Sequence, residues 1–259
     1  MKSVTTFLVP VSFLLMVGCV TEGVPIAQPA SSEQAAQANR DLGIGYIEQN
    51  RPDLAIESLE RALDLEPRSA ETQSAIAVAY DMTRDFELAE QHHRRATQLA
   101  PANPNIQNSY AVFLCRQSRW QDAAPYFQRA VANSGRVSPV SILNNAGTCA
   151  LASGDLAGAE SQFRSALQLE PDNAVALRGM INVSIRSEDY LNGRAFFQRL
   201  ERSTMLQAPD LLSCYVIETR LGDTAAAGDC ETRLQREFAG SSTLRQLRDF
   251  QQNASARVQ

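Results

Sequence analysis

The sequence predicts an all-α protein built from about six stacked helix-turn-helix repeats and closed by a C-terminal capping helix. One pattern of small and large apolar residues returns every 34 residues from about residue 36 onward. Alanine is abundant, Val and Ile are modest, and aromatic residues make up 7% of the chain, a mixture that favours helices over strands. A unit of this length cannot bury its apolar face alone, so neighbouring units must stack. We therefore expect an extended array of helical hairpins.

The first three repeats carry the pattern most clearly, at positions 7, 8, 11, 20, 24, 27 and 32 of the 34-residue unit. The first repeat has Leu42, Gly43, Tyr46, Ala55, Leu59, Ala62 and Pro67 there, and the second has Ile76, Ala77, Tyr80, Ala89, His93, Ala96 and Pro101. The third has Tyr110, Ala111, Leu114, Ala123, Phe127 and Ala130. These are the signature positions of the tetratricopeptide repeat, so the chain resembles that family. The resemblance implies a right-handed superhelix.

The residue types at these positions follow from helix packing. Small residues at positions 8, 20 and 27 let the two antiparallel helices approach closely, and larger residues at positions 7, 11 and 24 fill the space between them. Proline at position 32 ends the second helix. A two-residue insertion near Gly135 shifts the fourth repeat, which has Ala146, Gly147, Ala159, Phe163, Ala166 and Pro171.

The last part of the chain keeps the pattern more weakly. A fifth repeat has Met180, Gly193 and Phe197, and a sixth has Tyr215, Ala227 and Leu234. Residues 241–250 carry Leu244, Leu247 and Phe250 at helical spacing, which predicts a terminal capping helix. The repeat domain is expected to span residues 33–251, and the polar residues 252–259 are expected to be disordered.

The first 18 residues predict a lipoprotein signal peptide. Lys2 supplies a positive start, and residues 4–17 form an apolar run that is too short to span a bilayer. The run ends in Met16-Val17-Gly18-Cys19, which resembles the bacterial lipobox, where the cysteine thiol is diacylated before cleavage. The alternative is an ordinary cleaved signal peptide followed by an unmodified cysteine.

Residues 19–32 are predicted to form a flexible tether from the lipidated Cys19, because they contain two prolines and no helical period. Lipoproteins of this class carry three acyl chains, and several chains together hold a protein stably to a membrane. Val20 stands where an aspartate would resemble an inner-membrane retention signal. The expected location is therefore the periplasmic face of the outer membrane.

The four cysteines that remain after lipidation of Cys19 are an even number, as expected of disulfides in an oxidising compartment. Cys115 and Cys149 are 34 residues apart, which places them on the first helices of adjacent repeats. Cys214 and Cys230 face each other across the inter-helix turn of the sixth repeat. We expect one disulfide in each pair, and the alternative is buried free thiols.

Several classes of function are excluded or disfavoured. The net charge of −5 and the lack of any basic run argue against binding to nucleic acid. No GxSxG, HExxH, P-loop or CxxC pattern occurs, so we expect no enzymatic activity, no cofactor and no metal site. His92 and His93 point about 100° apart on a helix and cannot easily share a metal ion. His93 occupies position 24, so we expect it in the core.

Taken over essentially the whole chain, the arrangement resembles the type IV pilus biogenesis and stability lipoproteins, the PilF/PilW pilotin family. The likeness lies in the lipobox, the short tether, the six repeats and the C-terminal helix. Its more specific stretches are NRDLGIGYIEQNRPDLAIESLERALDLEP, NSYAVFLCRQSRWQDAAPYFQRA and LNNAGTCALASGDLAGAESQF. The family's usual Tyr before Gly147 is Ala146 here, and the sixth repeat is degenerate.

The resemblance implies a protein that binds secretin subunits, together with other type IV pilus components, and promotes their outer-membrane localisation and assembly into a multimer. We expect it to act as a monomer. Two alternatives stay open: a generic periplasmic repeat lipoprotein for envelope or Tad-type pilus assembly, and a recruiter of a peptidoglycan-acting enzyme.

The partner is expected to bind the concave face, which the first helices line in this family through positions 2, 5, 9, 12 and 13. Apolar residues there predict a groove, because an exposed apolar patch usually marks a binding site. The groove residues are Ile44, Ile47, Val78, Met82 and Val112, with Asn108 and Asn144 placed to bond a peptide backbone. Further along, Arg178 and Arg186 are expected to make the face basic. The alternative is that these residues pack between neighbouring helices.

Lipidation generates the first testable prediction. Mass spectrometry of the mature amino terminus should find an acylated Cys19, and Cys19→Ser should release the protein into the periplasm and weaken its activity. Cleavage at another residue, or an unmodified cysteine, would contradict the interpretation of the lipobox.

Overall fold

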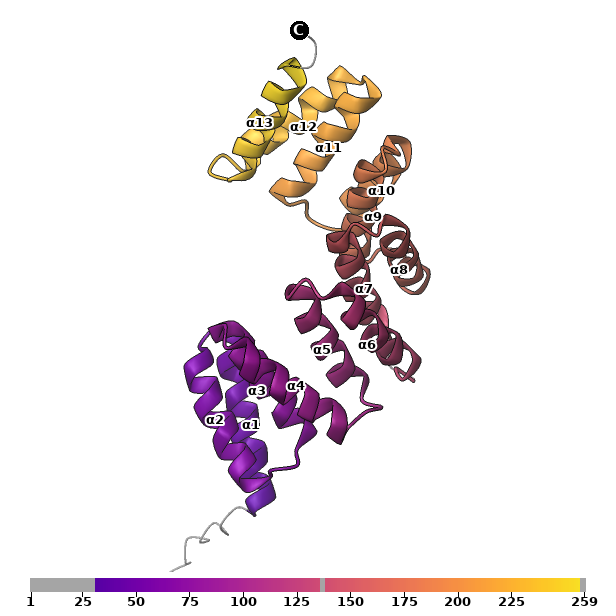
Figure 1. Cartoon of the computed structure of the whole chain (residues 1–259). Coiled ribbons are helices and arrows are strands. Elements are labelled where there is room, and N and C mark those ends of the chain that lie inside the picture. The colour runs from indigo at the N-terminus through magenta and orange to yellow at the C-terminus, as the bar shows by residue number, and fades with distance from the viewer. Residues whose placement is uncertain (1–30, 136–137, 257–259) are drawn as a thin grey trace, which may run out of the picture.

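The computed structural model describes residues 31–135 and 138–256. Cys19, the predicted signal peptide and residues 19–30 of the predicted tether lie outside the described residues, as do residues 257–259. Within the described ranges the chain forms thirteen α-helices and no strand, which confirms the all-α prediction. Figure 1 shows the helices stacked in chain order as an elongated curved array, from α1 (indigo) to α13 (yellow).

The helices pair into six hairpins and one final helix. They are α1 (Ser32–Glu48) with α2 (Pro52–Leu65), α3 (Ala70–Thr83) with α4 (Phe86–Leu99), α5 (Pro104–Arg116) with α6 (Trp120–Ala132), α7 (Val140–Ser153) with α8 (Leu156–Leu169), α9 (Ala174–Arg186) with α10 (Tyr190–Ser203), α11 (Ala208–Leu221) with α12 (Thr224–Glu237), and α13 (Thr243–Ala256). From the second repeat onward, the first helix of each repeat begins at position 1. The 34-residue register predicted from the sequence is therefore confirmed.

Local sequence signals explain where the helices begin. Ser69, Asn103 and Asn173 stand one residue before a first helix, and the side chain of each accepts a backbone N–H of the first helical turn. Such N-caps satisfy donors that have no partner inside the helix. Ser31 forms a capping box with Gln34, so α1 begins at Ser32, one residue before the predicted start of the repeat domain.

The turn inside each repeat depends on a residue in the left-handed backbone region. Positive φ angles occur at Asn50, Arg84, Ser118, Gly154, Glu188 and Gly222, all at position 15 of their repeats. Only two of the six are glycine, although glycine adopts this region most readily. The closing of the hairpin thus imposes this conformation even on residues that disfavour it.

The core within a repeat is built on the contact between positions 8 and 24. In the fourth repeat, Phe163 is 1% exposed. A Cβ atom added to Gly147 would lie only 2.8 Å from the Phe163 ring. In the first repeat, Leu59 lies 2.5 Å from the place of a Cβ on Gly43. The small residues therefore let the two helices approach closely, as the sequence predicted.

Neighbouring repeats share their cores. Buried residues from α7 to α13, including Leu177, Met180, Leu211 and Leu247, form one apolar cluster. Successive first helices (α1, α3, α5, α7, α9, α11) contact one another directly, whereas among the described residues no comparable contact joins successive second helices. The first helices are therefore the closer-spaced side of the array, which curves it with these helices on the concave face (Figure 1).

The two cysteine pairs lie where the sequence placed them. The structure joins Cys115 of α5 to Cys149 of α7, with their Cα atoms 5.8 Å apart. It also joins Cys214 of α11 to Cys230 of α12, with Cα atoms 6.1 Å apart. Both Cα separations lie in the usual range for disulfides. The first bridge links adjacent repeats, and the second closes the weakest one.

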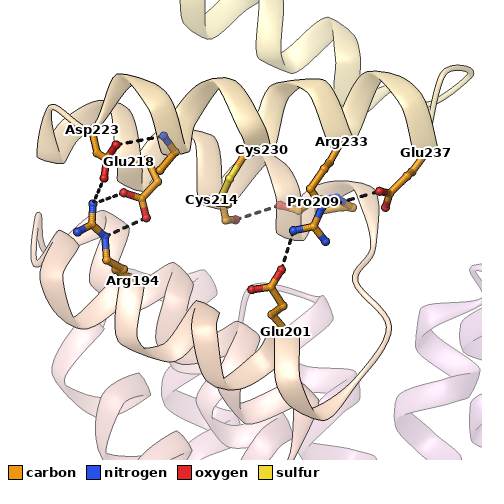
Figure 2. The surroundings of a disulfide bond; sticks show 11 residues. Arg194, Glu201, Pro209, Cys214, Glu218, Asp223, Cys230, Arg233 and Glu237 are labelled. Carbon is orange, nitrogen blue, oxygen red and sulfur yellow. Dashed lines mark hydrogen bonds and ion pairs between the residues drawn. A yellow bond between two sulfur atoms is a disulfide. The ribbon is translucent and has the colours of Figure 1, made fainter.

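Ion pairs flank the second bridge and tie the sixth repeat to the fifth (Figure 2). Arg194 of α10 donates to Glu218, which is 6% exposed, and also lies 3.4 Å from Asp223. At the other end, Arg233 of α12 lies 2.6 Å from Glu201 of α10. The repeat with the weakest signature is thus held by polar contacts that the sequence pattern did not reveal.

The final helix α13 covers the end of the core. Leu247 is buried, and Phe250 packs edge-on against Tyr215 with ring centroids 5.9 Å apart. This confirms the capping helix. The helix runs to Ala256, whereas the sequence analysis placed the end of the repeat domain at residue 251 and expected disorder from residue 252. Among the described residues, none of the helices combines the length and the apolar character needed to cross a membrane.

His93 is a core residue, as predicted. It is 1% exposed and packs against the rings of Tyr110 and Phe113, with centroids 5.4 and 5.1 Å away. Its Nδ1 has no hydrogen-bond partner among the described residues. Burial, together with a smaller effect of the neighbouring His92 and against the opposing charge of Glu90, lowers the pKa of His93 to about 3. The neutral imidazole therefore replaces the apolar side chain found at position 24 of other repeats.

The glycine contacts generate a prediction about packing. A Cβ on Gly179 would lie 2.4 Å from the Phe163 ring. Gly179→Ala should therefore destabilise the protein by about 1–3 kcal/mol, because the ring cannot move aside in a close-packed core. The matched control is Gly228→Ala in α12, where no atom lies within 4 Å. It should stabilise by about 0.5–1 kcal/mol, because alanine favours helix over glycine. Urea unfolding followed by circular dichroism measures both, and shifts of the same sign would contradict the packing account.

The buried histidine generates a prediction about pH. The pKa of His93 falls from 6.5 in the unfolded chain to about 3 in the folded protein. The unfolded state therefore binds the extra proton between these values, and stability should be full above pH 6.5 and decline as the pH falls toward 3. His93→Phe restores the residue type of Phe127 and Phe163 at the same position. The thermal unfolding temperature of this variant should depend less on pH across that window. If the slope of the unfolding temperature against pH is unchanged, other titratable groups cause the pH dependence.

Candidate partner-binding face

The concave face carries an apolar stripe over its first half only. Position 9 of the six first helices is occupied by Ile44, Val78, Val112, Thr148, Asn182 and Val216. Because the helices α1, α3 and α5 contact in sequence, the first three of these side chains follow one another on adjacent helices. The stripe is thus aliphatic over repeats one to three and becomes polar at α7.

The predicted groove residues differ in how accessible they are. Ile44 is 38% exposed, which is unusual for a large aliphatic side chain in the repeat core. Val78 and Met82 are half-buried on α3. Ile47 and Val112 are also half-buried, but each packs against a buried core cluster. Ile44, Val78 and Met82 therefore offer the contact surface, while Ile47 and Val112 also serve the packing between helices.

The two predicted asparagines are engaged in contacts between repeats. Asn145 Nδ2 donates to Asn108 Oδ1 at 3.1 Å, and Asn144 Nδ2 donates to Asn173 Oδ1 at 3.0 Å. Asn173 Oδ1 also accepts the backbone N–H of Ala176, which fixes it as an acceptor. The amide nitrogen of Asn144 must therefore point toward Asn173.

This orientation leaves Asn144 Oδ1 buried without a hydrogen-bond partner among the described residues. Asn144 is 7% exposed. A buried acceptor without a partner is unfavourable, so the site favours any donor that reaches it. Because this oxygen is itself buried, an incoming N–H group reaches it only if the side chains that cover it move.

The expectation of a basic face is wrong for Arg178, because a carboxylate already pairs with this arginine. Arg178 Nε lies 2.9 Å from Asp210 Oδ1, and its Nη2 lies 2.9 Å from Oδ2 of the same carboxylate, which is 4% exposed. Arg186 donates to the backbone oxygen of Leu151 at 2.7 Å. Both side chains thus link neighbouring repeats, but only the charge of Arg178 is balanced by a carboxylate.

A related contact was not recognised from the sequence. Arg116, at the same repeat position as Arg186, reaches back to Asp81 of the preceding repeat at 2.8 Å. The signal that could have revealed it is the recurrence of arginine at position 13, in Arg116, Arg186 and Arg220. These arginine contacts join the concave helices of neighbouring repeats. The aliphatic stripe is then the main chemical feature of the concave face. In the described ranges, no group of three or more His, Cys, Asp or Glu residues is arranged to hold a metal ion.

Comparison with known proteins agrees with the repeat architecture. The family model described as Tetratricopeptide repeat matches residues 40–104 and 109–204. The type IV pilus assembly protein PilF of Pseudomonas aeruginosa is 25% identical over 234 residues, which cover 88% of this chain and 93% of that protein. An uncharacterised protein of Haemophilus influenzae is 26% identical over 151 residues, covering 58% of this chain and 83% of that protein.

Two solved structures of pilus proteins share the fold. The crystal structure of PilW, described as a widely conserved type IV pilus biogenesis factor, superimposes with a TM-score of 0.76 at 25% identity, covering 83% of this chain and 98% of that one. The structure of Pseudomonas aeruginosa PilF gives a TM-score of 0.73 at 23% identity, covering 86% and 99%. The resemblance drawn from the sequence is confirmed, since the chain is homologous to PilF and PilW.

Proposed function

We propose that this chain, which belongs to the tetratricopeptide repeat family, is a non-enzymatic adaptor that binds secretin subunits and promotes their assembly at the outer membrane during type IV pilus biogenesis. Tetratricopeptide arrays act as scaffolds that present an extended concave surface to other proteins. The similarity to a type IV pilus assembly protein over most of both chains supports the pilus context.

The observation that carries the proposal is the aliphatic stripe of Ile44, Val78 and Val112 at position 9 of three consecutive first helices. A partly exposed apolar stripe of this kind suits the apolar face of an amphipathic segment laid along the groove. Secretins are the partner that the family resemblance implies. The segment of the secretin is therefore defined by its chemistry: apolar residues recurring on one face.

A polar group next to the end of the aliphatic stripe adds a requirement for the bound segment. Asn144 Oδ1 is buried and lacks a donor among the described residues, one repeat beyond Val112. In the proposed complex it accepts an N–H group from the bound segment. Such a bond adds orientation to an otherwise apolar contact, because only one placement of the segment satisfies the oxygen.

Location is part of the proposed role. Lipidation at Cys19 would hold the repeat array at the outer membrane, within reach of the tether of residues 19–32. About a dozen extended residues span roughly 40 Å, so the groove would act close to the membrane surface. Secretin subunits captured there would be concentrated where their multimer forms.

Charge placed in the stripe tests the proposal. Ile44→Asp and Val78→Asp should each weaken binding of purified secretin by about tenfold or more, because a carboxylate must lose its water on entering an apolar contact. Helical circular dichroism should stay unchanged, since neither side chain is fully buried. The matched control is Val216→Asp, at the same repeat position but three repeats beyond the aliphatic stripe, and it should bind within about twofold of the parent.

A cellular measurement separates this function from the alternatives. In a strain that lacks the gene, secretin should run as monomer instead of heat-resistant multimer on a gel, and the Val78→Asp protein should fail to restore the multimer. Normal multimers in the deletion strain would exclude the secretin role. Normal binding by both aspartate variants would exclude the concave stripe as its site.

A further inference from the structure

A second, chemically different site lies on the outer side of the array, between the second helices of repeats three and four. A cavity of about 760 Å³ opens between α6 and α8, and α7 forms its floor. This volume lies in the range typical of ligand sites. Its apolar lining includes Trp120, Phe127 and Val131 of α6 and Ala146 and Ala150 of α7. The cavity is separate from the concave stripe and goes beyond the function proposed above.

One residue explains why the cavity exists at this junction. Position 7 of the repeat carries a large side chain in the neighbouring repeats: Ile76, Tyr110 and Met180, each no more than 2% exposed. The fourth repeat has Ala146 at this position, and it lines the cavity. The methyl group leaves unfilled the volume that a larger residue occupies elsewhere.

The corresponding space one junction earlier has a different chemistry. Between α4 and α6 the surface is lined by Arg94, Arg119 and Arg129 together with Asp122 and the ring of Tyr126. That surface carries three arginines and one carboxylate, and Arg119 lies 2.8 Å from Asp122 within it. The α6–α8 cavity is therefore the more apolar of the two.

The edges of the cavity show what kind of ligand it suits. Gln121 and Gln128 of α6 and Gln162 of α8 line it, and in the described part of the chain none of their side-chain amides forms a hydrogen bond. An amide both donates and accepts, so it matches the N–H and C=O groups of a polypeptide backbone. A purely hydrocarbon ligand would cover these amides without offering any partner.

The charge of the cavity lining narrows the choice of ligand further. Asp155 is the one charged residue of the lining, and no cation pairs with it among the described residues. One of its oxygens caps α8 by accepting the N–H of Gly158 at 2.9 Å, which leaves the carboxylate charge at the cavity edge. A ligand with a positive charge beside its apolar group complements this site.

We propose that the α6–α8 cavity binds a polypeptide segment of a partner protein, which inserts a bulky aromatic or aliphatic side chain over Ala146 and places a Lys or Arg beside Asp155. The three glutamines bond the backbone on either side of the anchor. The array then engages two proteins at once, one on the concave face and one on the outer face.

The chain contains a single tryptophan, and it lines this cavity. Emission from Trp120 therefore reports occupancy directly. The probe is a blocked, unstructured peptide of Gly and Ser with a central Lys-Phe-Phe-Lys sequence, so its backbone N–H and C=O groups are free, and it has no tryptophan of its own. Titration into the full mature protein should shift the Trp120 emission to shorter wavelength with saturation. Matched peptides with Glu in place of Lys, or Ser in place of Phe, should bind at least about tenfold more weakly.

Variants test the site itself. Ala146→Leu fills the cavity with a side chain of the size found at position 7 elsewhere and should weaken peptide binding at least about tenfold. Ala152→Leu, the same change on the same helix outside the lining, should leave binding unchanged. Ala124→Lys, at an exposed position of α6, supplies a second blocking variant that does not alter the core, and it should also abolish binding. Asp155→Asn keeps the helix cap and should weaken the Lys peptide by about twofold to fivefold.

The outcomes separate this inference from the concave-face function. Val78→Asp should bind the peptide normally, so loss of secretin binding with retained peptide binding supports two independent sites. Equal binding by the parent, Ala146→Leu and Ala124→Lys would overturn the cavity. Saturable binding of palmitate in preference to the peptide would show that the ligand is not a polypeptide. An unchanged Trp120 emission with every peptide would also contradict the proposal.

Discussion

Everything in this array depends on how closely the two helices of a repeat approach each other. The approach is set by a large side chain at position 24 resting on a small residue at position 8, as Phe163 rests on Gly147 and Leu59 on Gly43. A close-packed contact of this kind tolerates little change in volume on either side. His93 shows what the position demands, since a titratable ring there is kept neutral by burial. Where the signature weakens in the sixth repeat, the disulfide of Cys214 and the ion pairs around Arg194 supply the missing restraint.

Because each hairpin is rigid, function is decided at the surfaces between hairpins. The concave side presents aliphatic residues over the first three repeats, and beyond them its polar side chains are used for ties such as Arg178 to Asp210. The outer side is polar between α4 and α6 and apolar between α6 and α8. One repeat pattern thus produces surfaces of opposite character, because the outward-facing positions vary more than position 20, which is alanine or glycine in all six repeats. The two proposed binding sites lie on these two surfaces.

A single departure from the pattern has the largest local effect. Ala146 stands at a position where the second, third and fifth repeats carry large buried residues, and it lines a cavity beside the only tryptophan of the chain. The disulfide between Cys115 and Cys149 joins the two first helices beneath this junction, and Cys149 itself lines the cavity. Closure of the cavity by a shift between repeats three and four is therefore opposed by a covalent link.

The sequence by itself determined the helices, their register and the core. Helix bounds depend on local signals such as the caps at Ser69 and Asn173, and the 34-residue period places each packing residue without reference to the rest of the chain. It also placed the two cysteines of each pair next to each other. Cys115 and Cys149 are one repeat length of 34 residues apart, and Cys214 and Cys230 lie on the two helices of one repeat. Only the tertiary structure decided which surface groups are free. Arg178 is paired with a carboxylate 32 residues away, and Asn144 is fixed by a side chain 29 residues away. Such contacts join side chains on neighbouring repeats, and a periodic pattern gives their positions but neither their directions nor the space left between them.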